Sequence, residues 1–307
     1  MKGVSITHLT HGQLGNHNAG EGGGNVSTLK RYAGRPYISG QSYRHAIRSA
    51  YRSLVDEGFR CVPKHACGNI EQCKSCDLFG YMRPDTDLDY SKRMSPISVT
   101  PLLGQYDADV VADLILQYGV DTADNKLAHR EMAENVYRGS LTIDTEAIGR
   151  REIQEIDSCA DDGHEYSRRF EQRIDNVDRE GRIRETLTAI QHAVKFAGQS
   201  RHMADFMPDL VALAVQDTHT HRLANALHVD PETGDLDIDA LGNTLHDVSN
   251  LGGDIHVGLS HNPVVIQNWS EVADLFESMD DVTFHDTVTD AFDGVRASIN
   301  VNELRGG

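Results

Sequence analysis

The sequence predicts an α+β fold, because strand and helix patterns mix along the chain without the regular rhythm of a parallel βαβ protein. The chain has 307 residues, and 39% of them are hydrophobic, which is enough to bury a sizeable core. Neither an internal repeat nor a low-complexity tract interrupts it. We therefore expect a single elaborated domain over residues 1–307.

The elements follow from apolar periodicity. Residues 4–10 alternate apolar and polar side chains and predict a first strand. A helix is expected from about 41 to 57, with Ser39 in position to cap it. Apolar residues at helical spacing predict another helix over 105–118. Further strands are predicted at 137–148, 210–215 and 254–259, and further helices at 184–196 and 270–279.

The charge is unevenly distributed. The net charge is −18, which by itself argues against a nucleic-acid partner. Residues 1–55, however, hold seven lysines and arginines against one acid, Glu21, so this segment carries +6 and the remainder −24. A basic segment on an acidic body is typical of a local polyanion site. Arg44, Arg48 and Arg52 recur every four residues and form a basic stripe on the predicted helix, although a solvated helix face has the same pattern.

The choice of charged residues suggests a salt-rich cytosol. Only seven of the 29 basic residues are lysines, and aspartates dominate the acids. Such a surface keeps a protein hydrated in molar salt and predicts a halophilic source. The alternative is an acidic protein from an organism that lives at ordinary salt concentrations. No run approaches 18 apolar residues, and the N-terminus lacks the apolar core of a signal peptide, so we expect a cytoplasmic protein without a membrane partner.

Four cysteines cluster in the irregular segment 61–100, with the spacing Cys61-x5-Cys67-x5-Cys73-x2-Cys76. A two-residue separation lets two thiolates reach one tetrahedral Zn²⁺, and His65 is a further candidate ligand. The sequence thus predicts a structural zinc site at these four cysteines. Buried thiols that pack a loop-rich subdomain are the alternative. No histidine and acid accompany them in a way that indicates a catalytic cysteine.

Five short motifs, in order, resemble the CRISPR-associated autoregulator DevR family, the backbone subunits of type I Cascade, with the I-B and I-A subtypes as candidates. They are Ser39-Gly40-Gln41-x2-Arg44-x3-Arg48, Cys73-x2-Cys76-x-Leu78-Phe79-Gly80, Arg93-x-Ser95-Pro96, Tyr137-x-Gly139-x-Leu141, and Gly198-x2-Arg201 before Pro208. Together they span roughly residues 35–210, and past about residue 220 the resemblance is diffuse.

The resemblance implies a ferredoxin-like or RRM-like palm of the repeat-associated mysterious protein superfamily, with long finger and thumb insertions. We place an inserted cysteine finger at 58–100 and a thumb at about 215–252. The family resemblance also implies that copies of the chain stack head to tail along CRISPR RNA. The partners implied are the target DNA strand, the other Cascade subunits (Cas five, Cas eight and Cas six types) and the recruited helicase-nuclease.

The Gly/Asn-rich loop and the arginine helix fit a grip on RNA phosphates, because backbone can approach closely and guanidinium groups meet two phosphate oxygens. The candidate RNA-binding residues share this segment or the later Gly-x2-Arg motif. They are Asn16, Asn18, Lys30, Arg31, Arg35, Ser39, Gly40, Gln41, Arg44, Arg48, Gln199, Ser200 and Arg201.

Two other classes of function remain as alternatives. Asp85, Asp87 and Asp89 lie in a polar loop and suit a metal-dependent endoribonuclease like the type III backbone subunits. Aspartate is abundant throughout this chain, however, and the motifs favour the non-cleaving branch, so we expect no catalytic residues and no required cofactor other than structural zinc. A metal-dependent regulatory or DNA-binding protein would depend on His219-Thr220-His221 and the cysteines.

Overall fold

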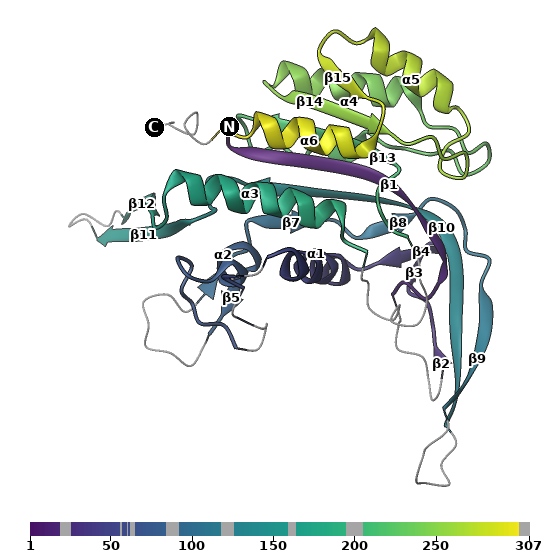
Figure 1. Cartoon of the computed structure of the whole chain (residues 1–307), viewed down its shortest axis with the longest axis horizontal. Coiled ribbons are helices and arrows are strands. Elements are labelled where there is room, and N and C mark those ends of the chain that lie inside the picture. Colours follow the sequence, from purple (N-terminus) through teal and green to yellow (C-terminus); the bar gives the residue numbers. More distant parts are fainter. Residues whose placement is uncertain are drawn as a thin grey trace.

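The computed structural model describes residues 1–18, 26–55, 57–59, 61, 65–83, 92–117, 126–158, 164–194 and 205–300. Its centre is an antiparallel group of strands in the order β13, β1, β10 and then β7 and β8. Helix α1 lies between β1 and β7 along the chain, and α3 lies between β10 and β13 (Figure 1). This is the βαββαβ order of a ferredoxin-like palm. The bounds are β1 Gly3–Gly15, α1 Gly40–Leu54, β7 Ile97–Val99, β8 Leu102–Gly104, β10 Lys126–Asp144, α3 Asn176–Gln191 and β13 Leu210–Gln216.

Both edges of the palm are extended, so that the described residues form an 11-stranded sheet. Within the described residues, two strands, three α-helices and the 3-10 helix η1 follow β13, with β14 antiparallel to it and β15 parallel to β14. Two short strands, β3 and β4, continue the sheet beyond β8. These elements are β3 Arg31–Tyr32, β4 Arg35–Ile38, η1 Arg222–Asn225, α4 Ile238–Asn250, β14 Asp254–Leu259, α5 Trp269–Ser278, β15 Val282–His285 and α6 Val288–Ser298.

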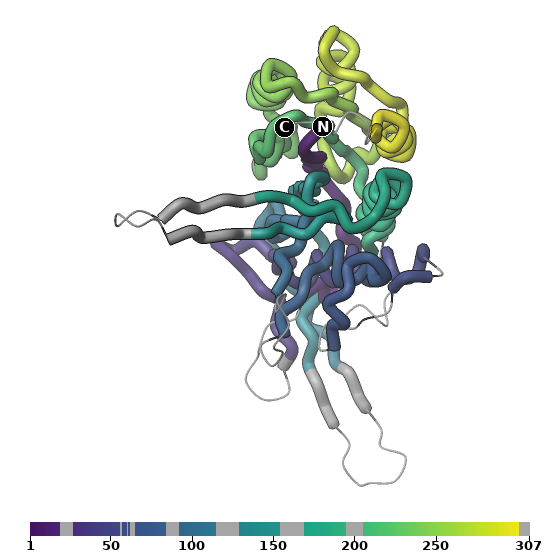
Figure 2. Tube along the Cα trace, turned by 90° about the vertical axis from the view of Figure 1, so that its left-hand side faces the viewer, coloured from purple at the N-terminus to yellow at the C-terminus, as the bar shows by residue number. Residues whose placement is uncertain are grey.

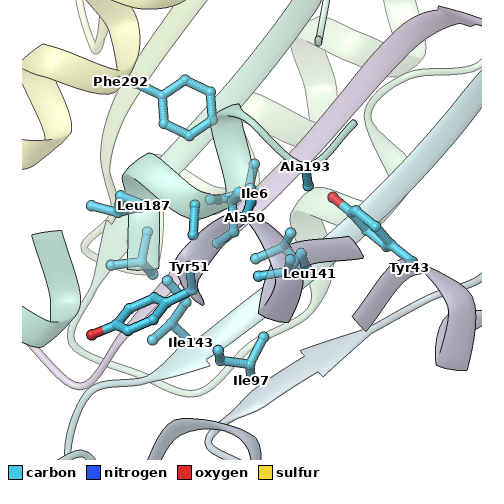
Figure 3. Close-up of a cluster of buried hydrophobic side chains, with 14 of the residues drawn as sticks. Ile6, Tyr43, Ala50, Tyr51, Ile97, Leu141, Ile143, Leu187, Ala193 and Phe292 are labelled. Carbon is cyan, nitrogen blue, oxygen red and sulfur yellow. The ribbon is translucent and has the colours of Figure 1, made fainter. Parts of the chain in front are cut away.

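The sheet has an apolar core on each face. Alternation in β1 sends Val4 and Ile6 to the face covered by α1, α3 and α6. Figure 3 shows Ile6 there, among side chains of α1, α3 and α6. Leu9 points to the opposite face, where η1, α4 and α5 pack against β13 and β14. The helices are therefore held by burial of one apolar side, and the central strands by burial of both faces.

Three insertions leave the palm. The cysteine finger, between α1 and β7, holds α2 (Lys74–Phe79), β5 (Tyr81–Met82) and β6 (Lys92–Arg93). One hairpin joins β9 (Val111–Gln117) to the outer part of β10, which also pairs with β2 (Val26–Ser27). A second joins β11 (Arg150–Ser158) to β12 (His164–Gln172). The two hairpins project from the body in different directions (Figure 2).

The α+β class and the ferredoxin-like palm are confirmed. The predicted strands and the helices at 41–57, 184–196 and 270–279 are also present. Their bounds agree within a few residues, except that β10 and α3 begin earlier than predicted. The helix predicted over 105–118 is wrong, since its second half is the strand β9, which pairs with β10. The segment proposed as a thumb, about 215–252, contains η1 and α4, which pack against β13 and β14. Within the described ranges, no helix is both long and apolar enough to cross a membrane.

Candidate nucleic-acid site and cysteine cluster

The start of α1 is fixed by side-chain hydrogen bonds. Ser39 is the N-cap, and its side chain accepts a 3.3 Å hydrogen bond from the Ser42 N–H. The Ser39 N–H in turn donates to Oδ1 of Asn18 over 2.9 Å. The first turn of α1 contains no acidic residue, so the partial positive charge of the helix N-terminus is left free to attract an anion.

A surface pocket of about 430 Å³ opens beside this helix. It is lined by Gly40, Gln41, Arg44, His45, Arg48, Phe79 and Val99. The structure thus brings together four of the predicted RNA-binding residues, Gly40, Gln41, Arg44 and Arg48, all from one motif of ten positions. It adds His45 and Phe79, which the sequence analysis did not assign to this site.

Arg44 is the exceptional residue of this pocket. Its side chain is half-buried, and its Nε–H is buried without a hydrogen-bond partner in the described structure. Buried donors are normally satisfied, and leaving one unpaired costs about 1–3 kcal/mol. The chain carries 47 acidic residues, yet no ion pair to Arg44 is formed by the described part of the chain. The pocket therefore presents an uncompensated guanidinium beside a helix N-terminus, which suits an anion with several acceptor oxygens.

Arg48 is not free on the surface as the basic stripe predicts. Its Nη2 donates to the carbonyl of Cys61 over 3.0 Å and to Oγ of Ser75 over 2.6 Å. The guanidinium also lies over the rings of Phe59 and Phe79, at 5.5 and 5.7 Å from their centroids. Burial lowers its pKa from the ordinary arginine value. Arg48 lines the pocket but is held there by the cysteine finger.

The remaining predicted RNA-binding residues have other surroundings. Asn16 and Asn18 are buried, and Nδ2 of Asn16 donates to the Glu131 carbonyl over 2.7 Å. Arg31 forms a 3.0 Å ion pair with the carboxylate of the same Glu131. Lys30 and Arg35 are half-buried near β3 and β4 and do not line the pocket. Gln199, Ser200 and Arg201, and the candidate nuclease residues Asp85, Asp87 and Asp89, lie outside the described residues.

The finger brings the four predicted cysteine ligands together. The sulfur atoms of Cys61, Cys67, Cys73 and Cys76 all lie within 4.8 Å of one another, and those of Cys67 and Cys76 are 3.7 Å apart. Four thiolates at about 2.3 Å from one tetrahedral zinc lie about 3.8 Å apart, so the donor set and spacing fit Zn²⁺. His65, the other candidate ligand, is exposed and is not part of this cluster.

A buried ionic node joins the finger to the palm, and it was not foreseen from the sequence. Asp77 has no exposed surface, and its carboxylate accepts from Arg93 at 2.5 Å and from Arg182 of α3 at 2.6 Å. The Gly149 N–H donates to the same carboxylate at 3.0 and 3.1 Å. Arg93 also donates to the Ala147 carbonyl at 2.8 Å. The only sequence signal was that Asp77 and Arg93 lie within two of the five motifs.

Two motif glycines are required by close packing. Gly80 has a φ of +70°, and a Cβ there would lie 2.5 Å from the Arg93 carbonyl oxygen. A Cβ on Gly139 would lie 2.1 Å from Cδ2 of Leu102. Ser95 donates to the Leu78 carbonyl over 2.8 Å, which ties two motifs together. These motif residues thus build the fold, whereas the Ser39–Arg48 motif supplies most of the pocket lining, with Phe79 and Val99 completing it.

The fold and the pocket define a class of protein, a ferredoxin-like palm that carries a cysteine finger and an arginine-lined pocket beside its first helix. The sequence profile described as "CRISPR-associated negative auto-regulator DevR/Csa2" matches residues 62–221, and the chain belongs to this family.

Solved structures share the fold. One titled "CRISPR RNA-guided surveillance complex" aligns with a TM-score of 0.59 and 15% identity, over 96% of this chain and 99% of that one. Another, titled "CRISPR RNA-guided surveillance complex, pre-nicking", aligns with the same TM-score and coverage and 12% identity. No curated protein sequence matches the chain significantly.

Proposed function

We propose that this chain is a CRISPR RNA-binding backbone subunit of a type I Cascade, and that the pocket on α1 holds the RNA backbone. The observation that carries the proposal is the Arg44 guanidinium, half-buried beside the helix N-terminus with its Nε–H unpaired in the described structure. A phosphodiester supplies the acceptor oxygens that this group lacks, and arginine meets them in a planar, two-pronged geometry.

The other parts of the pocket support an extended strand of RNA. Gln41 is exposed at the rim and offers an amide donor and acceptor to a phosphate or ribose. Phosphate contacts of this kind position a strand without reading its sequence, as a guide with a variable spacer requires. Copies stacked along the RNA would leave its bases free for the target DNA strand, and the two projecting hairpins offer surfaces for neighbouring copies and for other Cascade subunits.

The proposal gives the chain no catalytic role. We expect the purified complex to leave complementary single-stranded RNA intact in Mg²⁺ or Mn²⁺. Cleavage that is lost on Asp87→Ala would instead favour a type III-like endoribonuclease.

The cysteine cluster completes the proposal as a structural zinc site. Zinc at Cys61 and Cys76 would hold the finger on which Arg48 rests, because Arg48 bonds the Cys61 carbonyl and Ser75, the neighbour of Cys76. The metal would thus contribute stability and no chemistry.

The test is RNA retention by matched arginine variants. Arg44→Ala removes the unpaired guanidinium, and we expect about a 10- to 100-fold loss of affinity, as for loss of a hydrogen bond to a charged group. Arg44→Lys keeps the charge and loses the planar geometry, so it should recover only part of the affinity. Arg52→Ala makes the same truncation on the same helix, outside the pocket, and should change affinity little.

The readouts are the repeat-spacer RNA that co-purifies and filter binding of synthetic guide RNA across a salt series. Loss of one phosphate contact should also reduce the slope of log affinity against log salt by about 0.7. Folded Arg44→Ala protein that retains guide RNA as wild type does would refute the assignment of the pocket. Equal losses in Arg44→Ala and Arg52→Ala would favour the whole basic stripe over the pocket.

A further inference from the structure

A second pocket, of about 210 Å³, lies at the end of β10 on the sheet face opposite α1. Its walls include Asp144 of β10, Gln216 of β13, and His219 and His221 from the loop after β13. Nε2 of His219 lies 3.3 Å from Oε2 of Glu146 and 3.8 Å from Oδ1 of Asp144. One imidazole therefore meets two carboxylates that come from 73 or more residues earlier in the chain.

The carboxylate and the loop are held in place by the surrounding backbone. Oδ1 of Asp144 accepts from the N–H groups of Glu146 and Ala147 at 3.0 and 3.1 Å. Ser5 of β1 donates to Oε1 of Gln216 over 2.8 Å and to the Thr220 carbonyl over 3.0 Å. The three donor atoms thus converge on a scaffold made by three separate segments, and all lie within 4.8 Å of one another.

Gln216 supplies an independent indication of a ligand. It is 2% exposed and lines this same pocket, and its Nε2 has no hydrogen-bond partner in the described structure. A buried amide donor without an acceptor is costly, so an acceptor oxygen that enters the pocket beside Gln216 would be favourable. A water molecule bound to a cation would supply that oxygen.

We propose that Asp144, Glu146 and His219 bind a divalent cation of the Mn²⁺ type, which keeps bound water in the pocket. Two donors at about 2.1 Å from one ion lie roughly 3 to 3.5 Å apart at octahedral or tetrahedral angles, close to the separations observed. Two carboxylates with one imidazole favour Mn²⁺ over Mg²⁺ and Ca²⁺, which prefer oxygen alone. The four thiols of the finger are softer and bind zinc more tightly, so one equivalent of zinc fills the finger first and leaves the second site open to Mn²⁺.

The bound ion would clamp the loop after β13 to the turn after β10. His219 is 47% exposed, so a plain ion pair with Glu146 would be worth little in water. An ion that bridges both carboxylates and the imidazole holds the same two segments more firmly. Binding should therefore raise the melting temperature as the Mn²⁺ concentration rises.

The experiment titrates Mn²⁺ into zinc-loaded full-length protein and follows free Mn²⁺ by electron paramagnetic resonance. We expect one saturable site that Mg²⁺ displaces only at much higher concentration. His219→Ala and Glu146→Gln should each weaken binding at least tenfold and abolish the rise in melting temperature. His221→Ala alters the same pocket outside the cluster and should bind Mn²⁺ as wild type does.

Absence of saturable binding, or equal affinity in all three variants, would overturn the site and leave His219 as an ion-pair partner only. Circular dichroism checks that His219→Ala is folded, and Glu146→Gln provides a second variant of similar shape. Arg44→Ala should bind Mn²⁺ normally, so the result is separate from the test of RNA binding.

Discussion

Replacing Asp77 by Asn tests whether the buried ionic node holds the finger on the palm. The substitution keeps the shape of the side chain but removes the charge that faces Arg93 and Arg182, whose side chains are 10% and 5% exposed. Removing one partner of a buried ion pair typically costs about 3–5 kcal/mol. Arg182 also donates to the Ile70 and Glu71 carbonyls. Because both arginines keep other acceptors, we expect the loss in free energy of unfolding to lie at the lower end of this range, at about 3 kcal/mol.

Urea denaturation followed by circular dichroism measures this cost. With a slope of about 3 kcal/mol per molar urea, the midpoint should fall by about 1 M. Hydrogen exchange should accelerate at α2, which carries Asp77, more than at β1. Asp280→Asn is the matched control, because Asp280 is exposed, and it should stay within about 0.5 kcal/mol of wild type. A midpoint for Asp77→Asn within that range would refute the assignment of the node as a structural tie.

Three further outcomes are expected. Elemental analysis should find one zinc per chain, and chelation or Cys76→Ser should loosen the finger and, through Arg48, weaken RNA retention. Burial lowers the pKa of both His8 and His17 to about 4, against 6.5 in the unfolded chain. The free energy of unfolding should therefore be at its full value above pH 6.5 and should fall as the pH drops toward 4, by up to about 3 kcal/mol for each histidine. A urea series over pH 4.5–8 checks this, and His17→Gln should flatten the profile. If the acidic surface is an adaptation to salt, size-exclusion chromatography should show the complex intact in molar KCl and dissociated in dilute buffer; the opposite order would exclude that reading.

The palm was predictable because its helices bury one apolar face at helical spacing, whereas its central strands are buried on both faces and read as short apolar-rich runs. The prediction of a helix over 105–118 was wrong for the opposite reason. Val111 and Leu114 are about half exposed in β9, so no core fixes the period there, and pairing with β10 decides the conformation. The hairpin of β11 and β12 was also missed, because its charged sequence carries little apolar alternation.

The pocket on α1 could be predicted as far as its motif and no further. The spacing of Arg44 and Arg48 places both on one side of the helix, and the structure agrees. The two arginines differ because the finger supplies partners to only one of them. Cys61 and Ser75 accept hydrogen bonds from Arg48, whereas no described residue accepts one from Nε of Arg44. A contact between segments so distant in sequence leaves no local pattern. The same holds for Arg182, whose partner Asp77 lies 105 residues earlier in the chain.

The net charge of −18 and the proposed RNA partner are compatible because screening makes charge a local property. At physiological ionic strength the Debye length is about 8 Å, so a phosphate in the pocket responds mainly to the groups that line it. Those groups are Arg44, Arg48 and the acid-free first turn of α1, with no carboxylate among the lining residues. The acidic remainder repels RNA from the rest of the surface. An acidic body with one uncompensated cationic pocket therefore restricts where a strand can lie, which a uniformly basic surface would not do.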